Sequence, residues 1–468
     1  MSKATRIAAI IGPLLAHAVV ASAQTVVAAP TTTVVVDSQA KAPTQAKAPV
    51  KEPFAFADFT WLTGNSRQKF SVLDTKAFTG EFRADINYVN QFNHPKDHTI
   101  VGSTEVGREG EIQLQQLGIG GDFHYGNARG RLMTQFGMYS TMTPRNDASP
   151  ARGQWDLANA YRYISEGYGG YHWNKLNGIN LDGGIFLSYI GLYSYYNFDN
   201  WSYQPSYVSS NTPWFFTGLR LQVFTSDRLK IEPWLINGWQ SYGMFNQVPG
   251  AGAQIQWRPN GSLMLISNNY YGKDWLGIPD RRRLHTDNSI EAKYHEDSTQ
   301  FYSKGAFSVT ADLGCESGAG VKCNGGSTAN PSQNFLGIML YNRSWFAKDT
   351  YGLTLGGGGI INPGRYLVLL PPINGATAFS GTPYFTQNPG DKFRAWDASA
   401  TFDYMPDQFT TFRLEWNHRA ANVPYFAGSG GVTPPGGNTG TAGSVVPGWS
   451  PDLVKTETRL NLALLVKF

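Results

Sequence analysis

Polar and apolar side chains alternate strictly along several segments of the chain. From residue 81 to residue 88 every odd position is polar and every even position is apolar, and the same period of two returns over residues 289–295, 396–404 and 411–417. Successive side chains of a β-strand point to opposite faces, so each segment predicts a strand with one polar and one apolar face. Many such strands with almost no helical pattern between them predict an all-β protein.

The final strand of this kind ends on the last residue of the chain. Leu460, Leu462, Leu464, Val466 and Phe468 form one apolar face of it. An alternating strand closed by a terminal aromatic residue is similar to the C-terminal signature that the insertion machinery of bacterial outer-membrane barrels reads. On a soluble sheet, the same strand would expose an apolar edge to aggregation. Phe468 is therefore the candidate assembly signal, with the barrel-insertion machinery as its expected partner.

The connections between strands alternate between short polar turns and long loops rich in Gly and Pro. The short turns lie near residues 126–127, 174–178, 225–228, 258–261, 296–300, 347–350 and 405–407. The long loops lie near residues 91–110, 140–159, 191–213, 241–250, 271–287, 315–332, 361–394 and 421–453. Transmembrane strands need ~9–11 residues, and outer-membrane barrels combine short periplasmic turns, longer external loops and an even strand number. We expect a closed antiparallel transmembrane β-barrel of about 16 strands over residues 80–468.

The composition excludes several other classes of protein. Aromatic residues make up 14% of the chain and charged residues only 15%, which argues against a disordered protein. Two cysteines exclude a disulfide scaffold, and past the N-terminus no apolar run approaches the ~18 residues of a spanning helix. The small net charge gives no reason to expect a nucleic-acid partner. Aromatic clusters at residues 161–173, 189–201 and 214–216 suggest interfacial girdles.

The N-terminal part divides into three segments before the predicted barrel. Residues 1–23 have the basic start, apolar stretch and small-residue cleavage site of a signal peptide, which predicts export to the outer membrane. Residues 24–52, rich in Pro, Ala and Lys, form a flexible lead-in. Residues 53–79 are rich in aromatic side chains without alternation, and their expected place is packed in the lumen or beneath it.

The polar strand faces are the candidate pore lining. The charged residues on these faces are Glu81, Arg83, Asp85, Arg129, Arg131, Arg220, Glu291, Lys293, Asp397, Asp403, Arg413, Glu415 and Arg459. Opposed charges around a lumen can select solutes by their field and spacing. The alternative for any one of them is a wall position that only holds water-facing side chains. Across the turn near residue 407, we expect Asp403 to face Thr411 and to lie diagonal to Arg413.

A barrel of this width leaves an aqueous channel unless a loop narrows it. The candidate for that constriction is the loop of residues 203–213. We therefore expect passive diffusion of small hydrophilic solutes. The alternative is a barrel plugged by residues 54–78, with a structural or adhesive role for its external loops.

The chain resembles the OmpL-like β-barrel porins of Gram-negative bacteria. The stretches that carry the resemblance are Thr79–Arg83, Asn197–Tyr207, Ile231–Trp239 and Gly364–Gly375, within a match over residues 54–468. The resemblance implies an outer-membrane barrel with pore activity, and it supplies neither a substrate nor functional residues. Porins of sixteen strands are commonly homotrimers, an analogy at the level of the fold.

Motifs for catalysis or for binding a cofactor or metal do not emerge from the sequence. Residues 118–121 lack the later features of a nucleotide-binding loop, and no Gly-x-Ser-x-Gly motif occurs. His94 and His98 are the only close histidine pair, on a Pro-containing segment that makes a poor metal site. We expect no enzyme activity, no cofactor and no metal.

Two further features fall in predicted external loops. Cys315 and Cys323 are predicted to form a disulfide that stiffens its loop, because exported chains meet oxidising conditions. The run of arginines at residues 281–283 has the charge to attract anions to the mouth or to bind lipopolysaccharide phosphates.

Overall fold

A computed structural model describes residues 52–468 apart from residues 326, 328–331, 365, 368, 378–381 and 383–391. Residues 1–51 lie outside this part, so the predicted signal peptide and nearly all of the lead-in remain expectations. In the described residues no helix has the length and apolar character to cross a membrane.

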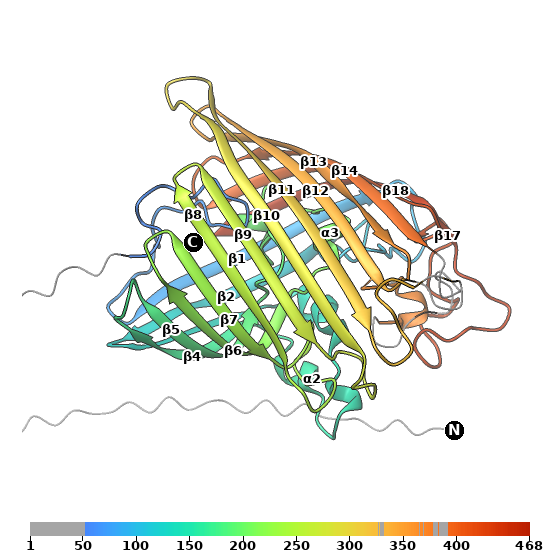
Figure 1. Ribbon diagram of the computed structural model, residues 1–468. Helices are drawn as coiled ribbons and strands as arrows, with labels where there is room; N and C mark the ends of the chain where they lie inside the picture. Colours follow the sequence, from blue (N-terminus) through green and yellow to red (C-terminus); the bar gives the residue numbers. More distant parts are fainter. Residues whose placement is uncertain are drawn as a thin grey trace, which may run out of the picture. The chain divides into compact units, whose positions relative to one another are not determined.

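Sixteen antiparallel strands close into a barrel (Figure 1). In chain order these are β1 (Phe78–Gln91), β2 (Ile112–Tyr125), β3 (Ala128–Thr134), β4 (Ile164–Trp173), β5 (Ile179–Leu187), β6 (Phe215–Phe224), β7 (Leu229–Ile236), β8 (Gly250–Asn260), β9 (Leu263–Gly272), β10 (Arg282–Glu296), β11 (Tyr302–Ser317), β12 (Asn334–Phe346), β13 (Tyr351–Asn362), β14 (Phe393–Tyr404), β15 (Thr410–Ala421) and β18 (Thr456–Lys467). Each strand pairs with its neighbour along the chain, and β18 pairs with both β15 and β1. The predicted fold is confirmed.

The loops carry the remaining short elements. These are α1 (Tyr139–Met142), η1 (Thr143–Asn146), η2 (Ser149–Ala151), α2 (Leu157–Tyr161), η3 (Asn197–Asp199), α3 (Tyr207–Ser210) and η4 (Ile373–Gly375), with the two-stranded sheet of β16 (Phe426–Ala427) and β17 (Leu453–Val454). All seven connections at the short-turn end are brief, and the other end bears the long loops. By the rule for such barrels, the long-loop end faces outward from the cell.

The wall has the polarity that the alternation predicts. On β15 the outward side chains of Leu414 and Trp416 are about two-fifths exposed, whereas the inward side chains of Arg413 and Glu415 are buried. The apolar face therefore turns to lipid and the charged face turns to the lumen.

The register at the β14–β15 hairpin differs from the prediction by two residues. Asp403 lies directly opposite Arg413 rather than Thr411, because the last pair before the turn is Tyr404 with Phe412. The longer turn leaves Asp403 and Arg413 in direct register, where they form an ion pair.

Part of the predicted aromatic girdle is wrong. Tyr163, Tyr171 and Trp173 are exposed on the wall, as a girdle requires. The tyrosines and the tryptophan of residues 189–201 are instead buried, and so are the aromatic residues of 214–216. The aromatic residues of 189–201 lie on the connection between β5 and β6, whose side chains pack inside the barrel. Their abundance therefore reflects a packed interior.

Candidate functional site

The loop between β5 and β6, residues 188–214, lies inside the lumen and is called here the inner loop. Every residue from 197 to 214 is buried, and α3 packs against β12, β13 and β14 within the ring of strands (Figure 1). The inner loop is held in place by hydrogen bonds to its main chain. Since buried N–H and C=O groups need partners, the charged side chains of the wall supply them.

Carboxylates of the wall accept hydrogen bonds from main-chain N–H groups of the inner loop. Glu415 on β15 accepts from the N–H of Tyr203 (2.6 Å) and of Gln204 (2.8 Å). Asp397 on β14 accepts from the Ser206 hydroxyl (2.7 Å) and the Tyr207 N–H (2.9 Å). Both carboxylates are thus used to seat the loop.

Arginines of the wall donate to main-chain carbonyls of the same loop. Arg413 donates to the carbonyls of Asn197 (3.2 Å) and Asn200 (2.7 Å) while it pairs with Asp403 (2.7 Å). Arg343 on β12 donates to the carbonyl of Trp201 and also pairs with Asp403. One carboxylate therefore balances two arginines that hold the inner loop.

The segment of residues 54–69, called here the N-terminal strap, lies against the short-turn end of the barrel. The Thr63 N–H donates to Glu291 on β10 (2.9 Å), and the Trp201 indole donates to the carbonyl of Trp61 (3.0 Å). Arg67 donates to the carbonyls of Asp407 and Thr410 in the β14–β15 turn (both 2.6 Å). The strap thus contacts the wall, the turns and the inner loop.

Arg67 is a partly buried cation at this junction. It borders a cavity of about 30 Å³ shared with Arg343 and Arg413. Burial lowers the pKa of Arg67 to about 10, with Asp403 opposing that shift and the two neighbouring arginines adding to it. Arg67 stays charged at neutral pH, and its hydrogen bonds pin the strap to the turn.

The predicted lining residues fall into two groups by what covers them. Nine of them are buried or shielded by the inner loop, the strap or neighbouring loops: Arg83, Asp85, Glu291, Lys293, Asp397, Asp403, Arg413, Glu415 and Arg459. The other four keep side-chain exposures between 10 and 28% on the side of β1, β3 and β6: Glu81, Arg129, Arg131 and Arg220. All thirteen project inward, but the structure brings together two regions rather than one ring.

The accessible group forms a network of mixed charge. Arg131 pairs with Glu81 (3.0 Å), Asp122 (2.8 Å) and Glu166 (2.8 Å), which come from β1, β2 and β4. Next to this network, Asp182 on β5 forms an ion pair with Arg220 (2.8 Å). These side chains retain water contact on one side of the lumen.

Several important charges were missed by the sequence reasoning. Arg343 and Arg419 lie on inward positions of strands, so extending the alternation through residues 341–345 and 417–419 would have found them. Asp199, which pairs with Arg83 (2.9 Å), lies on the inner loop, where no periodic pattern marks it. A loop residue of this kind carries no signal in the sequence alone.

The run of arginines at residues 281–283 was assigned wrongly to a loop. Arg282 and Arg283 belong to β10. Arg283 points inward and pairs with Glu316 (3.0 Å) and Asp274 (3.2 Å), and Arg281 also pairs with Glu316 (2.8 Å). Only Arg282 is exposed.

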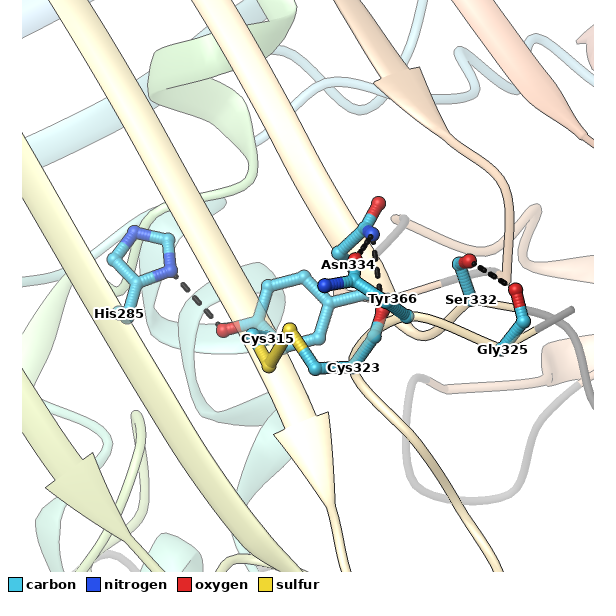
Figure 2. Close-up of a disulfide and its surroundings, with 8 residues drawn as sticks. His285, Cys315, Cys323, Gly325, Ser332, Asn334 and Tyr366 are labelled. Atoms are coloured by element: carbon cyan, nitrogen blue, oxygen red, sulfur yellow. Dashed lines mark hydrogen bonds between the residues drawn. A yellow bond between two sulfur atoms is a disulfide. The ribbon is translucent and has the colours of Figure 1, made fainter.

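The two cysteines are bonded to each other in the structure (Figure 2). Cys315 lies on β11 rather than in a loop, which corrects its predicted place. Asn334 at the start of β12 donates to the carbonyl of Cys323 (3.0 Å), so the bridge is tied to the adjacent strand. His98 contacts the carbonyl of Glu109, and the described residues hold no cluster of three or more potential metal ligands.

The family model described as "Putative beta-barrel porin-2, OmpL-like" matches residues 83–447. The chain belongs to this porin family. It is an outer-membrane porin for the passive diffusion of solutes, and family and fold both point to a channel without enzymatic activity.

Solved porin structures are similar to this porin at low sequence identity. OmpT of Vibrio cholerae is 9% identical, with 85% of this chain and 100% of that chain covered and a TM-score of 0.46. The channel DcaP of Acinetobacter baumannii is 11% identical, with the same coverage and TM-score. An anion-selective porin from Comamonas acidovorans is 10% identical, with 84% and 99% covered and a TM-score of 0.46. No curated protein matches the chain in sequence.

Proposed function

We propose that this porin is gated, and that small hydrophilic solutes diffuse through it when the inner loop and the N-terminal strap move away from the wall. The observation that carries the proposal is that wall charges bind the main chain of the inner loop between Asn197 and Tyr207. While these bonds persist, the loop occupies the space that a solute needs.

The route of solutes follows the side of β1 to β6. There Glu81, Arg129, Arg131 and Arg220 keep contact with water, whereas the opposite side is covered. With their partners Asp122, Glu166 and Asp182 included, four carboxylates lie beside these three arginines. The nearly balanced signs create a transverse field with little net charge. We therefore expect the open channel to discriminate weakly between anions and cations.

The second candidate function is a permanently plugged barrel whose external loops serve a structural or adhesive role. It is favoured by the bonds that join the strap to the inner loop, such as the one from Trp201 to Trp61. The two functions differ in one measurable property. A gated porin should conduct more often when the contacts of the strap are removed. A permanently plugged barrel should stay closed, because the other loops still fill its lumen.

Planar-bilayer recording of the purified mature protein tests the proposal. We expect brief, stepwise openings for the wild type, and longer openings after deletion of residues 54–69 or the milder substitution Arg67→Gln. Lys76→Gln removes an exposed charge near the strap and should leave opening unchanged. Silence of the wild type and both variants would support the plugged barrel, and constant conductance unaffected by the variants would refute gating.

The ion preference of the open state is measured in the same recordings. Because the accessible charges are mixed, the reversal potential in a salt gradient should stay close to zero. A reversal potential near the limit for one ion would contradict the assigned route along β1 to β6.

The remaining expectations concern export, assembly and partners. We propose cleavage after Ala23, insertion by the barrel-assembly machinery through Phe468, and contact with outer-membrane lipid and lipopolysaccharide. A trimeric form of OmpT from Vibrio cholerae is named among the similar structures, and we extend a homotrimer to this chain as part of the proposal. Mass measurement of the mature protein in detergent tests both the cleavage site and the number of chains.

A further inference from the structure

The outer wall of the barrel is hollowed near its long-loop end. Two grooves, of about 850 and 660 Å³, lie along β8 to β12 and along β12 to β15. Leu336 on β12 borders both of them, so the grooves adjoin. They form the surface called here the outer trough.

The sides of the trough are apolar and its floor contains small residues. Ile338, Ile361 and Trp396 are each about half exposed on the lipid-facing side of β12, β13 and β14. Gly359 lies between Ile338 and Trp396, and Ala420 lies on the other side of Trp396, so the surface is low at both positions. This shape suits acyl chains, which fill apolar grooves without directional bonds.

The rim of the trough carries exposed cations. Arg394 on β14 lines the trough, and Arg282 on β10, Lys322 beside the disulfide and Lys392 just before β14 each stand one or two residues from a lining residue. Among the described residues, none of the four has an ion-pair partner. This distinguishes Arg282 from its inward-facing neighbours Arg281 and Arg283, which are paired.

The register places Arg394 on the same rung as two apolar side chains of the trough. Leu336 lies opposite Ile361, which lies opposite Arg394, so the three residues form one rung across β12, β13 and β14. Neighbouring strands are ~4.8 Å apart, so Arg394 stands ~10 Å along the wall from Leu336. The guanidinium of Arg394 therefore stands beside the end of the groove that lies nearest the long loops.

The disulfide holds Lys322 beside the wall. Cys315 faces outward on β11, and its bond to Cys323 fixes the residue that follows Lys322 (Figure 2). The Gln333 N–H also donates to the carbonyl of Lys322 (3.0 Å). The bridge thus acts on the position of a cation at the rim.

Unpaired cations on the lipid side of a barrel are costly in hydrocarbon and favourable next to anionic headgroups. The long-loop end lies in the outer leaflet, so its headgroups are the available counter-charges. We propose that the outer trough binds a lipid with a phosphate-bearing headgroup and several acyl chains, of the lipopolysaccharide class. This inference rests on the outer-membrane placement of the porin, and it is independent of gating.

Titration with diphosphorylated lipid A, followed by native mass spectrometry of the full mature protein in detergent, tests the headgroup contacts. The triple variant Arg282→Gln, Lys322→Gln, Arg394→Gln should need at least tenfold more lipid A for half-saturation. The triple variant Lys76→Gln, Lys175→Gln, Lys348→Gln removes the same charge from the short-turn end and should bind like the wild type. Equal binding by both triple variants would overturn the proposal.

The acyl contacts are tested separately. Gly359→Leu fills the groove floor, and the nearest atom to a Cβ built there is a carbonyl oxygen 3.4 Å away, so the wall needs little adjustment. We expect this variant to bind lipid A at least fivefold more weakly. Dephosphorylated lipid A should bind weakly to all forms, and binding of free pyrophosphate without lipid A would overturn the lipid assignment.

Two controls separate the outcomes. Displacement of lipid A by a second copy of the chain, seen as a dimer or trimer without lipid, would also overturn the proposal. Bilayer recordings of the rim triple variant should match those of the wild type, because the trough lies outside the lumen. A failure of lipid binding with normal gating would therefore refute this inference and leave the proposed function intact.

Discussion

Gly358 on β13 leaves the space in which Ser206 of the inner loop lies. A Cβ added at this position would stand 2.5 Å from the Ser206 hydroxyl oxygen and 2.5 Å from the carbonyl oxygen of Ile338. We predict that Gly358→Ala displaces α3 from the wall and lowers the free energy of unfolding by about 1–3 kcal/mol, the usual cost of overpacking.

Denaturant unfolding in detergent and bilayer recording together measure this effect. The adjacent Gly359→Ala is the matched control, because its Cβ faces outward and finds its nearest neighbour at 3.4 Å. The Gly358 variant should also open more often than the control. Identical opening of both variants would show that α3 does not occlude the path.

Arg413 contributes through several partners at once. It is almost fully buried, pairs with Asp403 and donates to two carbonyls of the inner loop. Arg343 still pairs with Asp403 after Arg413→Gln, but the two buried loop carbonyls lose their donor. The substitution should therefore cost about 1–3 kcal/mol in the free energy of unfolding, the usual cost of unsatisfied buried polar groups. Arg129→Gln is the control, because Arg129 is partly exposed and lies 3.4 Å from Asp182, and its loss should cost less than about 1 kcal/mol.

At the scale of elements, the loop after β1 is joined to the loop after β15 through Asp97. Its carboxylate accepts a hydrogen bond from the Val432 N–H (2.8 Å). Burial alone would raise the pKa of Asp97. Hydrogen bonds from the Thr433 side chain and from the N–H groups of Val432 and Thr99 outweigh burial, so the pKa lies below the ordinary 3.8. A depressed carboxyl pKa stabilises the folded form above the unfolded pKa, and this contribution disappears as pH falls through the folded pKa.

The contact between these two loops should therefore weaken below about pH 4. Hydrogen exchange of the Val432 amide, followed from pH 6 to pH 3, measures it: protection should fall in the wild type as the carboxyl is protonated. Asp97→Asn should show weaker protection that changes little over the same interval after correction for intrinsic exchange. A pH response that persists in the Asn variant would assign the effect to other groups.

The elements that sequence predicts best are those with a simple period. The alternation along residues 411–417 and the short turns followed from strand geometry, so the sixteen strands and their polarity could be predicted. The aromatic run at 189–201 was misread, because a buried loop and an interfacial girdle both favour aromatic residues and neither has a period. The predicted register at Asp403 was wrong by two residues for a similar reason, because turn length depends on local geometry that alternation does not encode.

The candidate site shows the same limit for single residues. Inward projection of Glu415 or Asp397 follows from parity along a strand. Their burial depends on Tyr203, Ser206 and neighbouring loop residues, which contact them across 212 and 191 positions of sequence. Only the tertiary structure distinguishes a charge that lines water from a charge that binds a loop.

At the scale of the whole barrel, closure depends on the junction of the first and last strands. The N–H of Phe468 donates to the carbonyl of Phe82 (3.0 Å), the N–H of Phe82 donates back (2.6 Å), and the two rings stack with centroids 4.9 Å apart. The Phe468 side chain is nonetheless 46% exposed on the outer face. It is therefore both a packing partner in the closed barrel and a group that another protein can contact before closure.

These two roles predict different results for two substitutions at the same junction. Phe82→Ala and Phe468→Ala remove the same stacked pair, so both should lower the stability of barrels refolded in detergent by a similar amount, about 1 kcal/mol. In cells, Phe468→Ala should reduce the amount of protein in the outer membrane several-fold more than Phe82→Ala, because only the terminal ring belongs to the assembly signal. Quantitative immunoblots of outer-membrane fractions measure the difference, and equal losses would show that Phe468 acts through packing alone.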